Sequence, residues 1–94
     1  MCFEVNLTTL DWGSEISWTL GSCVSYERYG SYSKYTQQCC LAPGSYNLEC
    51  KDSLGDGWHG GYIEVDGIKH CESFTSGSEE TSEIIVQDGG KYFL

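Results

Sequence analysis

Basic residues are scarce in this chain: five lysines and arginines stand against 14 aspartates and glutamates, which gives a net charge of −9. Nucleic acids and anionic membrane surfaces attract basic patches, so this balance argues against both as partners. The sequence also lacks any run of 18 apolar residues, which argues against a segment inserted across a membrane. The excess of acid is compatible with cation binding and equally with plain solubility.

Motifs typical of enzymes are missing as well. The sequence contains neither a serine nucleophile elbow nor the helical histidine pair of metalloproteases. Its histidines are His59 and His70, and we expect His59 to be a polar residue at the tip of a loop. The sequence therefore predicts a protein that is not an enzyme.

The cysteines lack the spacing of a metal site, because no Cys-x-x-Cys pair occurs and no zinc template fits. A chain of 94 residues buries a modest core, and disulfides are the usual support for such a domain. We therefore expect three disulfides. Adjacent cysteines rarely join each other, but several pairings remain open. The six cysteines are Cys2, Cys23, Cys39, Cys40, Cys50 and Cys71.

Disulfides persist in oxidising compartments, so the cysteines predict a secreted, extracellular or cell-surface protein. The triplet Asn6-Leu7-Thr8 is an acceptor for glycosylation at Asn6, which fits that location. No signal peptide is visible, so the extracellular prediction depends on the cysteines. The length predicts a single domain over residues 1–94.

Alternating apolar and polar residues predict an all-β fold. In the first run, Phe3, Val5 and Leu7 alternate with polar residues, as in a half-buried strand. Residues 75–83 are expected to form a solvated loop. About eight short strands favour a small, disulfide-stapled antiparallel β-sandwich or jelly roll. The expected strands cover residues 3–8, 16–20, 23–26, 46–51, 63–65, 68–74, 84–86 and 91–94.

Tyrosines recur at every third position between residues 26 and 35, at Tyr26, Tyr29, Tyr32 and Tyr35. This period would place the four rings on one face of an extended or 3₁₀ segment, where Tyr29 and Tyr32 could stack on a sugar or on another subunit. The alternative is a loop whose tyrosines fold back over a small core.

The segment of residues 52–61 holds four glycines, Asp52, Asp56 and Trp58. Glycines allow a tightly folded loop, and carboxylates on such a loop offer the oxygen ligands that calcium prefers. The spacing does not fit an EF-hand, so Asp11 and Glu15 are the best candidates for further ligands. A tight acidic turn without an ion is the alternative. Trp58 is the loop's candidate for stacking on a ligand.

Two motifs resemble those of a repeat module found in large secreted and cell-surface proteins of algae, other protists and some bacteria. The first is Glu15-Ile16-Ser17-Trp18-Thr19-Leu20, which has the pattern Glu-x-Ser-Trp-x-Leu, and the second is Asp52-Ser53-Leu54-Gly55-Asp56-Gly57-Trp58. The resemblance covers about residues 5–75 and includes a Cys-Leu turn at Cys40-Leu41. It implies an extracellular β-sandwich with structural, adhesive or sugar-binding roles, and it supports pairing Asp11 and Glu15 with the second motif. The tyrosine run and the single unit depart from this pattern.

These observations lead to two functional hypotheses. The first is a non-catalytic extracellular structural or adhesive module that binds calcium and associates with itself as an oligomer or fibre. The second is a calcium-dependent carbohydrate-binding module, in which Trp58, Tyr29 and Tyr32 would stack on sugar rings.

Overall fold

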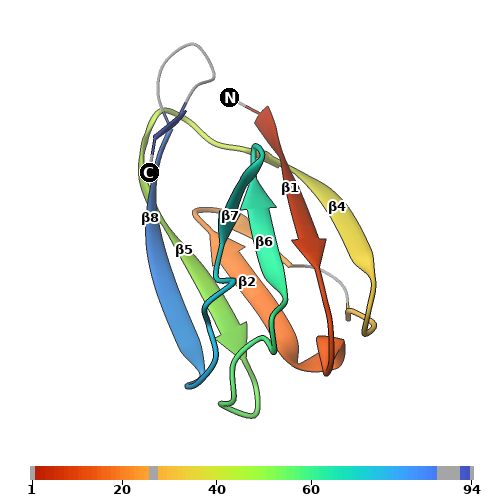
Figure 1. Cartoon of the computed structure of the whole chain (residues 1–94). Coiled ribbons are helices and arrows are strands. Elements are labelled where there is room, and N and C mark those ends of the chain that lie inside the picture. The colour runs from red at the N-terminus through yellow and green to blue at the C-terminus, as the bar shows by residue number, and fades with distance from the viewer. Residues whose placement is uncertain (1, 26–27, 87–91, 94) are drawn as a thin grey trace.

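The computed structural model describes residues 2–25, 28–86 and 92–93. In this part of the chain, two antiparallel sheets pack face to face and confirm the predicted β-sandwich (Figure 1). No helix among these residues has the length and apolar character needed to cross a bilayer. The elements are β1 (Cys2–Thr8), η1 (Gly13–Glu15, a 3₁₀ turn), β2 (Ile16–Leu20), β3 (Cys23–Val24), β4 (Lys34–Cys40), β5 (Gly44–Asp52), β6 (Tyr62–Val65), β7 (Ile68–His70), β8 (Glu79–Val86) and β9 (Tyr92–Phe93).

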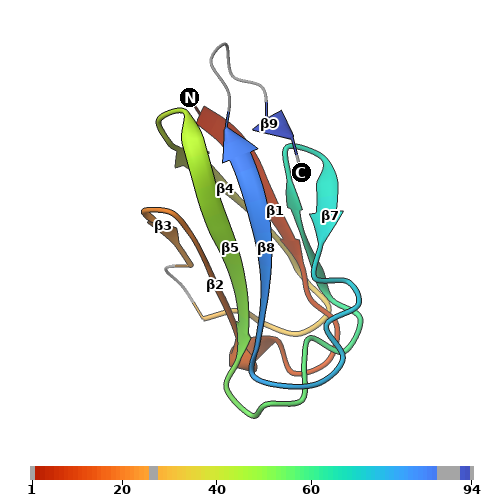
Figure 2. The same cartoon turned by 90° about the vertical axis from the view of Figure 1, so that its left-hand side faces the viewer.

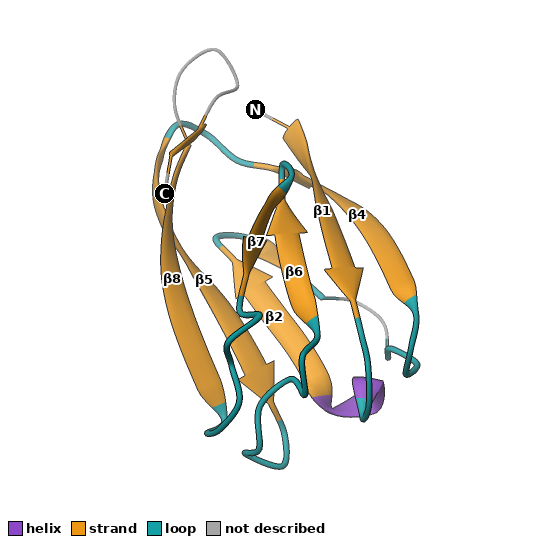
Figure 3. Cartoon of the chain, viewed as in Figure 1, coloured by secondary structure: helices purple, strands orange, loops and turns teal. Residues whose placement is uncertain are grey.

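The strands are divided between a four-stranded sheet, in the order β4-β1-β6-β7, and a five-stranded sheet, in the order β3-β2-β5-β8-β9. The connections lie alternately at two ends of the sandwich (Figures 2 and 3). We call one the turn end, which comprises residues 21–22, 41–43 and 66–67. The other is the loop end, which comprises residues 9–15, 28–33, 53–61 and 71–78.

The core follows from the alternation of the strands. Phe3, Val5 and Leu7 of β1 point inward, and they face a layer from the other sheet that includes Trp18 and Leu48. All of these side chains are buried. Burying one such side chain contributes roughly 1.5–3 kcal/mol. The alternating pattern therefore predicts the strands, and the burial of its inward-facing side chains stabilises the packing of the two sheets.

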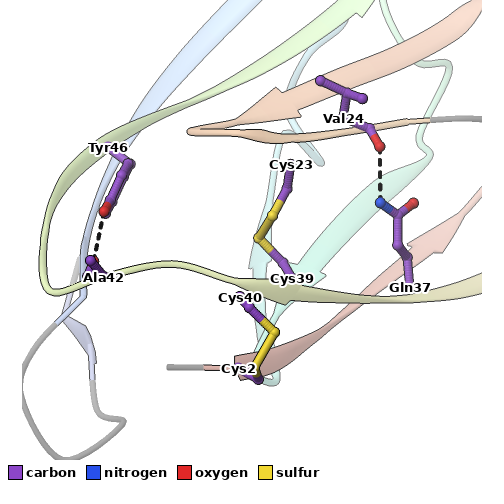
Figure 4. The surroundings of a disulfide bond; sticks show 8 residues. All are labelled: Cys2, Cys23, Val24, Gln37, Cys39, Cys40, Ala42 and Tyr46. Carbon is purple, nitrogen blue, oxygen red and sulfur yellow. Dashed lines mark hydrogen bonds between the residues drawn. A yellow bond between two sulfur atoms is a disulfide. The ribbon is translucent and has the colours of Figure 1, made fainter.

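The predicted three disulfides are present, and their pairing is Cys2–Cys40, Cys23–Cys39 and Cys50–Cys71. The first joins β1 to β4 within one sheet, and the second joins β3 to β4 across the sandwich (Figure 4). Beside the second bond, the Gln37 side-chain amide donates a hydrogen bond of 2.9 Å to the Val24 carbonyl. This side of the sandwich is thus closed by both covalent and polar contacts.

Several strands differ from the sequence-based prediction. The strand expected over residues 68–74 ends at His70, because the next residue, Cys71, has a positive φ of 63°. β4 was not predicted, because the three-residue spacing of the tyrosines obscures a period of two. β4 pairs with β1 along its full length, and Tyr35, Gln37 and Cys39 are its less exposed positions. β8 begins at Glu79, within the segment expected to be a solvated loop, because its backbone pairs with β5 from Lys51 onward. Tyr26, which ended one expected strand, lies outside the described residues.

Candidate metal centre

The loop end is a network of chain segments joined through their backbones. Four segments meet there, and each donates to or accepts from a neighbour, so the end is held in one arrangement before any ligand arrives. The joining hydrogen bonds measure 2.8–3.0 Å and run from Tyr32 N to Leu10 O, Ser53 N to Glu15 O, Asp52 N to Ser78 O, Gly77 N to Gly55 O and Trp58 N to Phe74 O.

Trp58 anchors the loop that connects β5 to β6. Its side chain is 0 % exposed, and its indole Nε1 donates a 2.8 Å hydrogen bond to the Lys51 carbonyl. The preceding residue, Gly57, has a φ of 82°, and a Cβ placed there would lie 2.5 Å from the Phe74 carbonyl oxygen. Only glycine fits this close approach. The buried indole and the glycine together give the acidic loop a fixed shape.

Asp52 is the last residue of β5, and the alternation of the strand turns it inward on the same face as Leu48 and Cys50. It is therefore only 3 % exposed. Its Oδ2 accepts a 2.8 Å hydrogen bond from the Asp56 backbone N–H, which folds the loop back over the strand end. Its Oδ1 is buried and has no hydrogen-bond partner. The fold thus buries one carboxylate oxygen of Asp52 without a hydrogen-bond partner.

Glu15 approaches the same place from the end of η1. Its Oε1 is also buried without a hydrogen-bond partner. Burial and the neighbouring charges of Asp52 and Asp56 raise the pKa of Glu15 above its usual value. Two ionised carboxylates cannot hydrogen-bond to each other, so Glu15 and Asp52 repel each other unless a proton or a cation lies between them.

His59 completes the cluster from the other side of the loop. Its Nε2 lies 3.3 Å from Asp56 Oδ1, an ion pair when the imidazole is protonated, and it forms no hydrogen bond. Hydrogen bonding with Asp52 and the proximity of His59 lower the pKa of Asp56. The ligand atoms of Glu15, Asp56 and His59 all lie within 4.8 Å of one another.

That spread fits a bound cation. Two oxygen ligands at about 2.4 Å from one calcium ion can be at most about 4.8 Å apart. A divalent cation among these atoms would neutralise the repulsion between the carboxylates and would give the buried groups of Glu15 and His59 a partner. The arrangement is suited to holding an ion. Of the four carboxylates predicted from the sequence, it brings Glu15 and Asp56 together with His59, and Asp52 lies close to both carboxylates.

Asp11 is the exception among those four. Its side chain is exposed, and its Oδ1 accepts a 2.8 Å hydrogen bond from the Tyr32 hydroxyl. It therefore does not join the cluster, because the turn before η1 directs it toward the loop of residues 28–33. His59 takes its place, although the sequence indicated only a polar loop-tip residue. The signal was its position, three residues after Asp56 in the same tightly folded loop.

The aromatic residues predicted to bind ligands are divided between the core and the surface. Trp58 and Tyr29 are 0 % and 4 % exposed, so their rings pack against protein and offer no face to a sugar. Tyr29 Oη accepts a 3.0 Å hydrogen bond from Trp18 Nε1 and its ring contacts Tyr35, which is the fold-back arrangement of the tyrosine run. Tyr32 is 68 % exposed, as a ligand-binding ring must be, and Trp12, which the sequence analysis passed over, is 58 % exposed.

Asn6 lies on β1, between β4 and β6. Its side chain is half-buried and forms hydrogen bonds with Glu4 and Thr36. The acceptor triplet is thus on the outer face of the four-stranded sheet, because Val5 and Leu7 on either side point inward.

Comparisons of the chain with protein-family models, with curated proteins and with solved structures returned no match. The resemblance to the secreted repeat module therefore stays a prediction. The functional argument that follows depends on the geometry of the chain itself.

Proposed function

We propose that this protein is a non-catalytic extracellular structural or adhesive module that binds calcium at its loop end and associates with copies of itself. Three disulfides support an oxidising, extracellular location. The acceptor triplet at Asn6 fits the same location and makes a glycoprotein part of the proposal.

One observation carries the calcium proposal: Asp52 is 97 % buried by the fold, and its Oδ1 has no hydrogen-bond partner. A buried carboxylate oxygen without a partner costs roughly 1–3 kcal/mol or more. Its neighbours Glu15 and Asp56 are also acidic, so no basic side chain of the cluster offsets its charge apart from His59 when protonated. A calcium ion would balance this negative charge, and it prefers the carboxylate oxygens that this cluster offers as ligands.

Self-association is supported by the open side of the sandwich. β8 pairs with β9 only at Ile85 and Val86, so among the described residues its segment 79–84 has no neighbour on the outer side. β7 is likewise an edge strand. Edge strands with free N–H and C=O groups can pair with a strand of another chain. Because β8 carries Glu79, Glu80 and Glu83, two copies would repel each other there unless cations screen the charge.

The test is light scattering coupled to size-exclusion chromatography at high protein concentration, in chelator and in millimolar calcium. We expect a larger species in calcium. A monomer in both conditions would rule out self-association. Thermal unfolding of the same samples reports calcium binding separately, because an ion that binds only the folded state raises the melting temperature.

A calcium-dependent carbohydrate-binding module is the second candidate, and the exposed rings of Trp12 and Tyr32 favour it. Both residues have positive φ, 61° and 52°, and Tyr32 N–H donates a 2.9 Å hydrogen bond to the Leu10 carbonyl, so their loops are held together. Tyr32 is also one wall of a groove of about 430 Å³, whose other lining residues are Thr8, Thr9, Leu10, Ser33 and Lys34. Exposed aromatic rings beside polar groups suit sugar faces. A glycan array without any binder in calcium would exclude this candidate.

A further inference from the structure

The loop-end cluster contains one donor that calcium does not prefer. Calcium takes oxygen ligands, whereas the imidazole nitrogen of histidine is typical of zinc and other borderline transition metals. His59 Nε2 is a buried atom without a hydrogen-bond partner, and it lies 3.3 Å from Asp56 Oδ1. A nitrogen held in this position has bonding capacity that an oxygen-only ion leaves unused.

The fold fixes this nitrogen in place. His59 has a φ of 54°, a left-handed conformation that a histidine adopts at some cost. The residues on both sides are anchored, because Trp58 is buried in the core and the Gly61 N–H donates a 2.8 Å hydrogen bond to the Trp58 carbonyl. Backbone strain alone does not indicate a ligand. Here it accounts for how a loop residue is held so that its side chain meets Glu15 and Asp56.

An independent observation points to a cation at the same place. Asp52 is 97 % buried, its Oδ1 has no hydrogen-bond partner, and its carboxylate interacts with both Glu15 and Asp56. It therefore adds a further negative charge close to two of the three donor residues. Two carboxylates and one imidazole form a mixed nitrogen and oxygen donor set of the kind that binds zinc. Zinc holds its nitrogen and oxygen ligands at about 2.1 Å, so the three donor atoms, which lie within 4.8 Å of one another, would draw to within about 4.2 Å around the ion.

We infer that Glu15, Asp56 and His59 bind Zn²⁺ directly, and that this site takes Zn²⁺ more tightly than Ca²⁺. The inference rests on the cation site of the proposed function and specifies which ion it selects. Calcium occupies the same site through the carboxylates alone, so zinc displaces it. Asp52 acts as a positioning residue, because its Oδ2 holds the Asp56 backbone at 2.8 Å and its charge lies beside Glu15.

The experiment is isothermal titration calorimetry of the metal-free full chain with Zn²⁺ and with Ca²⁺, for the wild type and two variants. His59→Asn removes the imidazole and keeps a residue that tolerates positive φ. Asp11→Asn is the matched control, because it removes an acid from the same end of the sandwich without touching the cluster. Circular dichroism verifies that each variant is folded.

We expect the wild type to bind Zn²⁺ at least about tenfold more tightly than Ca²⁺, and His59→Asn to lose at least about tenfold in Zn²⁺ affinity. The same variant keeps its Ca²⁺ affinity within about threefold, since carboxylates hold calcium. Asp11→Asn behaves like the wild type for both ions. In long-range ¹⁵N–¹H NMR spectra, the Nε2 signal of His59 shifts on zinc addition and that of His70 does not.

Three results would overturn the inference, and they separate it from the calcium proposal. If Ca²⁺ binds at least as tightly as Zn²⁺, the calcium proposal stands and the zinc inference fails. If Zn²⁺ binds His59→Asn as tightly as the wild type, His59 is not a ligand. If neither ion binds the wild type, both the inference and the calcium proposal fail together.

Discussion

The two ends of the sandwich differ in how many buried polar atoms without hydrogen-bond partners they contain among the described residues. The turn end has short connections and carries the disulfides Cys2–Cys40 and Cys23–Cys39. The loop end has long connections, and the buried side-chain atoms without hydrogen-bond partners, among the described residues, lie in it or at its border. They are Glu15 Oε1, Asp52 Oδ1, His59 Nε2 and His70 Nε2.

The backbone shows the same difference. Of the non-glycine residues with positive φ in the described part of the chain, Trp12, Tyr32, His59 and Cys71 belong to the loop end, and Asp66 alone belongs to the turn end. Unmet polar groups and left-handed residues each cost free energy, and they persist where the surrounding structure holds them in place. We conclude that the buried anchors of the loop end, above all Trp58, hold its charged cluster and its left-handed residues in place.

The largest expected effect comes from removing the residue that anchors the loop end. Trp58→Ala should lower the free energy of unfolding by roughly 3–5 kcal/mol, because it empties a large fully buried site. Trp12→Ala is the matched control: the residue is exposed at the same end, and the change should stay within about 0.5 kcal/mol. Urea denaturation measures both. Equal losses would contradict the distinction between anchor and surface residue.

The next largest effect is expected from removing one disulfide at each end of the sandwich and comparing the losses of stability. Replacing Cys50 and Cys71 by alanine should cost more than replacing Cys2 and Cys40, within the roughly 2–5 kcal/mol typical of a native disulfide. Cys50 and Cys71 are buried and join β5 to the residue after β7, whereas Cys2 and Cys40 are exposed on strands that already pair. Thermal unfolding of the two double variants would give this order, and the reverse order would show that burial does not decide the effect.

Glu15→Gln tests the charge repulsion at the loop end. Without divalent ions, the variant should melt at a slightly higher temperature than the wild type, because it removes one of the crowded negative charges. In calcium its melting temperature should rise less than that of the wild type, because it has lost a ligand. Differential scanning fluorimetry in chelator and in calcium checks both signs. A variant with the full calcium response would exclude Glu15 as a ligand.

The smallest expected effect concerns pH and the border of the loop end. Burial lowers the pKa of His70 below its ordinary 6.5, so between the two values the unfolded chain binds more protons than the folded chain. Stability should therefore fall as the pH drops through about 6.5, and keep falling until the folded-state pKa is passed. His70→Leu should flatten this slope relative to the wild type in thermal melts between pH 7.5 and about 5.5. An unchanged slope would assign the effect to other groups.

Much of the fold could be predicted from the sequence, because side chains on one face of a strand recur with a period of two. β1, β2 and β5 show that alternation clearly, and the structure contains them. β4 was not predicted, because its one tyrosine, Tyr35, continues a three-residue spacing that begins before the strand. The disulfide pairing could not be predicted either, because it depends on which strands become neighbours in the folded sandwich.

The candidate site could be predicted only in part, for a related reason. Asp52 and Asp56 are close in sequence, and Glu15 reaches them because β2 pairs with β5, which sets Ile16 opposite Asp52. Asp11 is only four residues earlier, yet the turn directs it to Tyr32. His59 follows Asp56 by three residues, and a left-handed backbone conformation, which the sequence did not predict, brings it into the cluster.

The central claim is that Asp52, whose buried Oδ1 has no hydrogen-bond partner, is part of a cation site. Its most direct test is the thermal unfolding of the wild type and of Asp52→Asn, each in chelator and in millimolar calcium. The account predicts that calcium raises the melting temperature of the wild type and raises that of the variant much less. A wild type that melts at the same temperature in both conditions would contradict it.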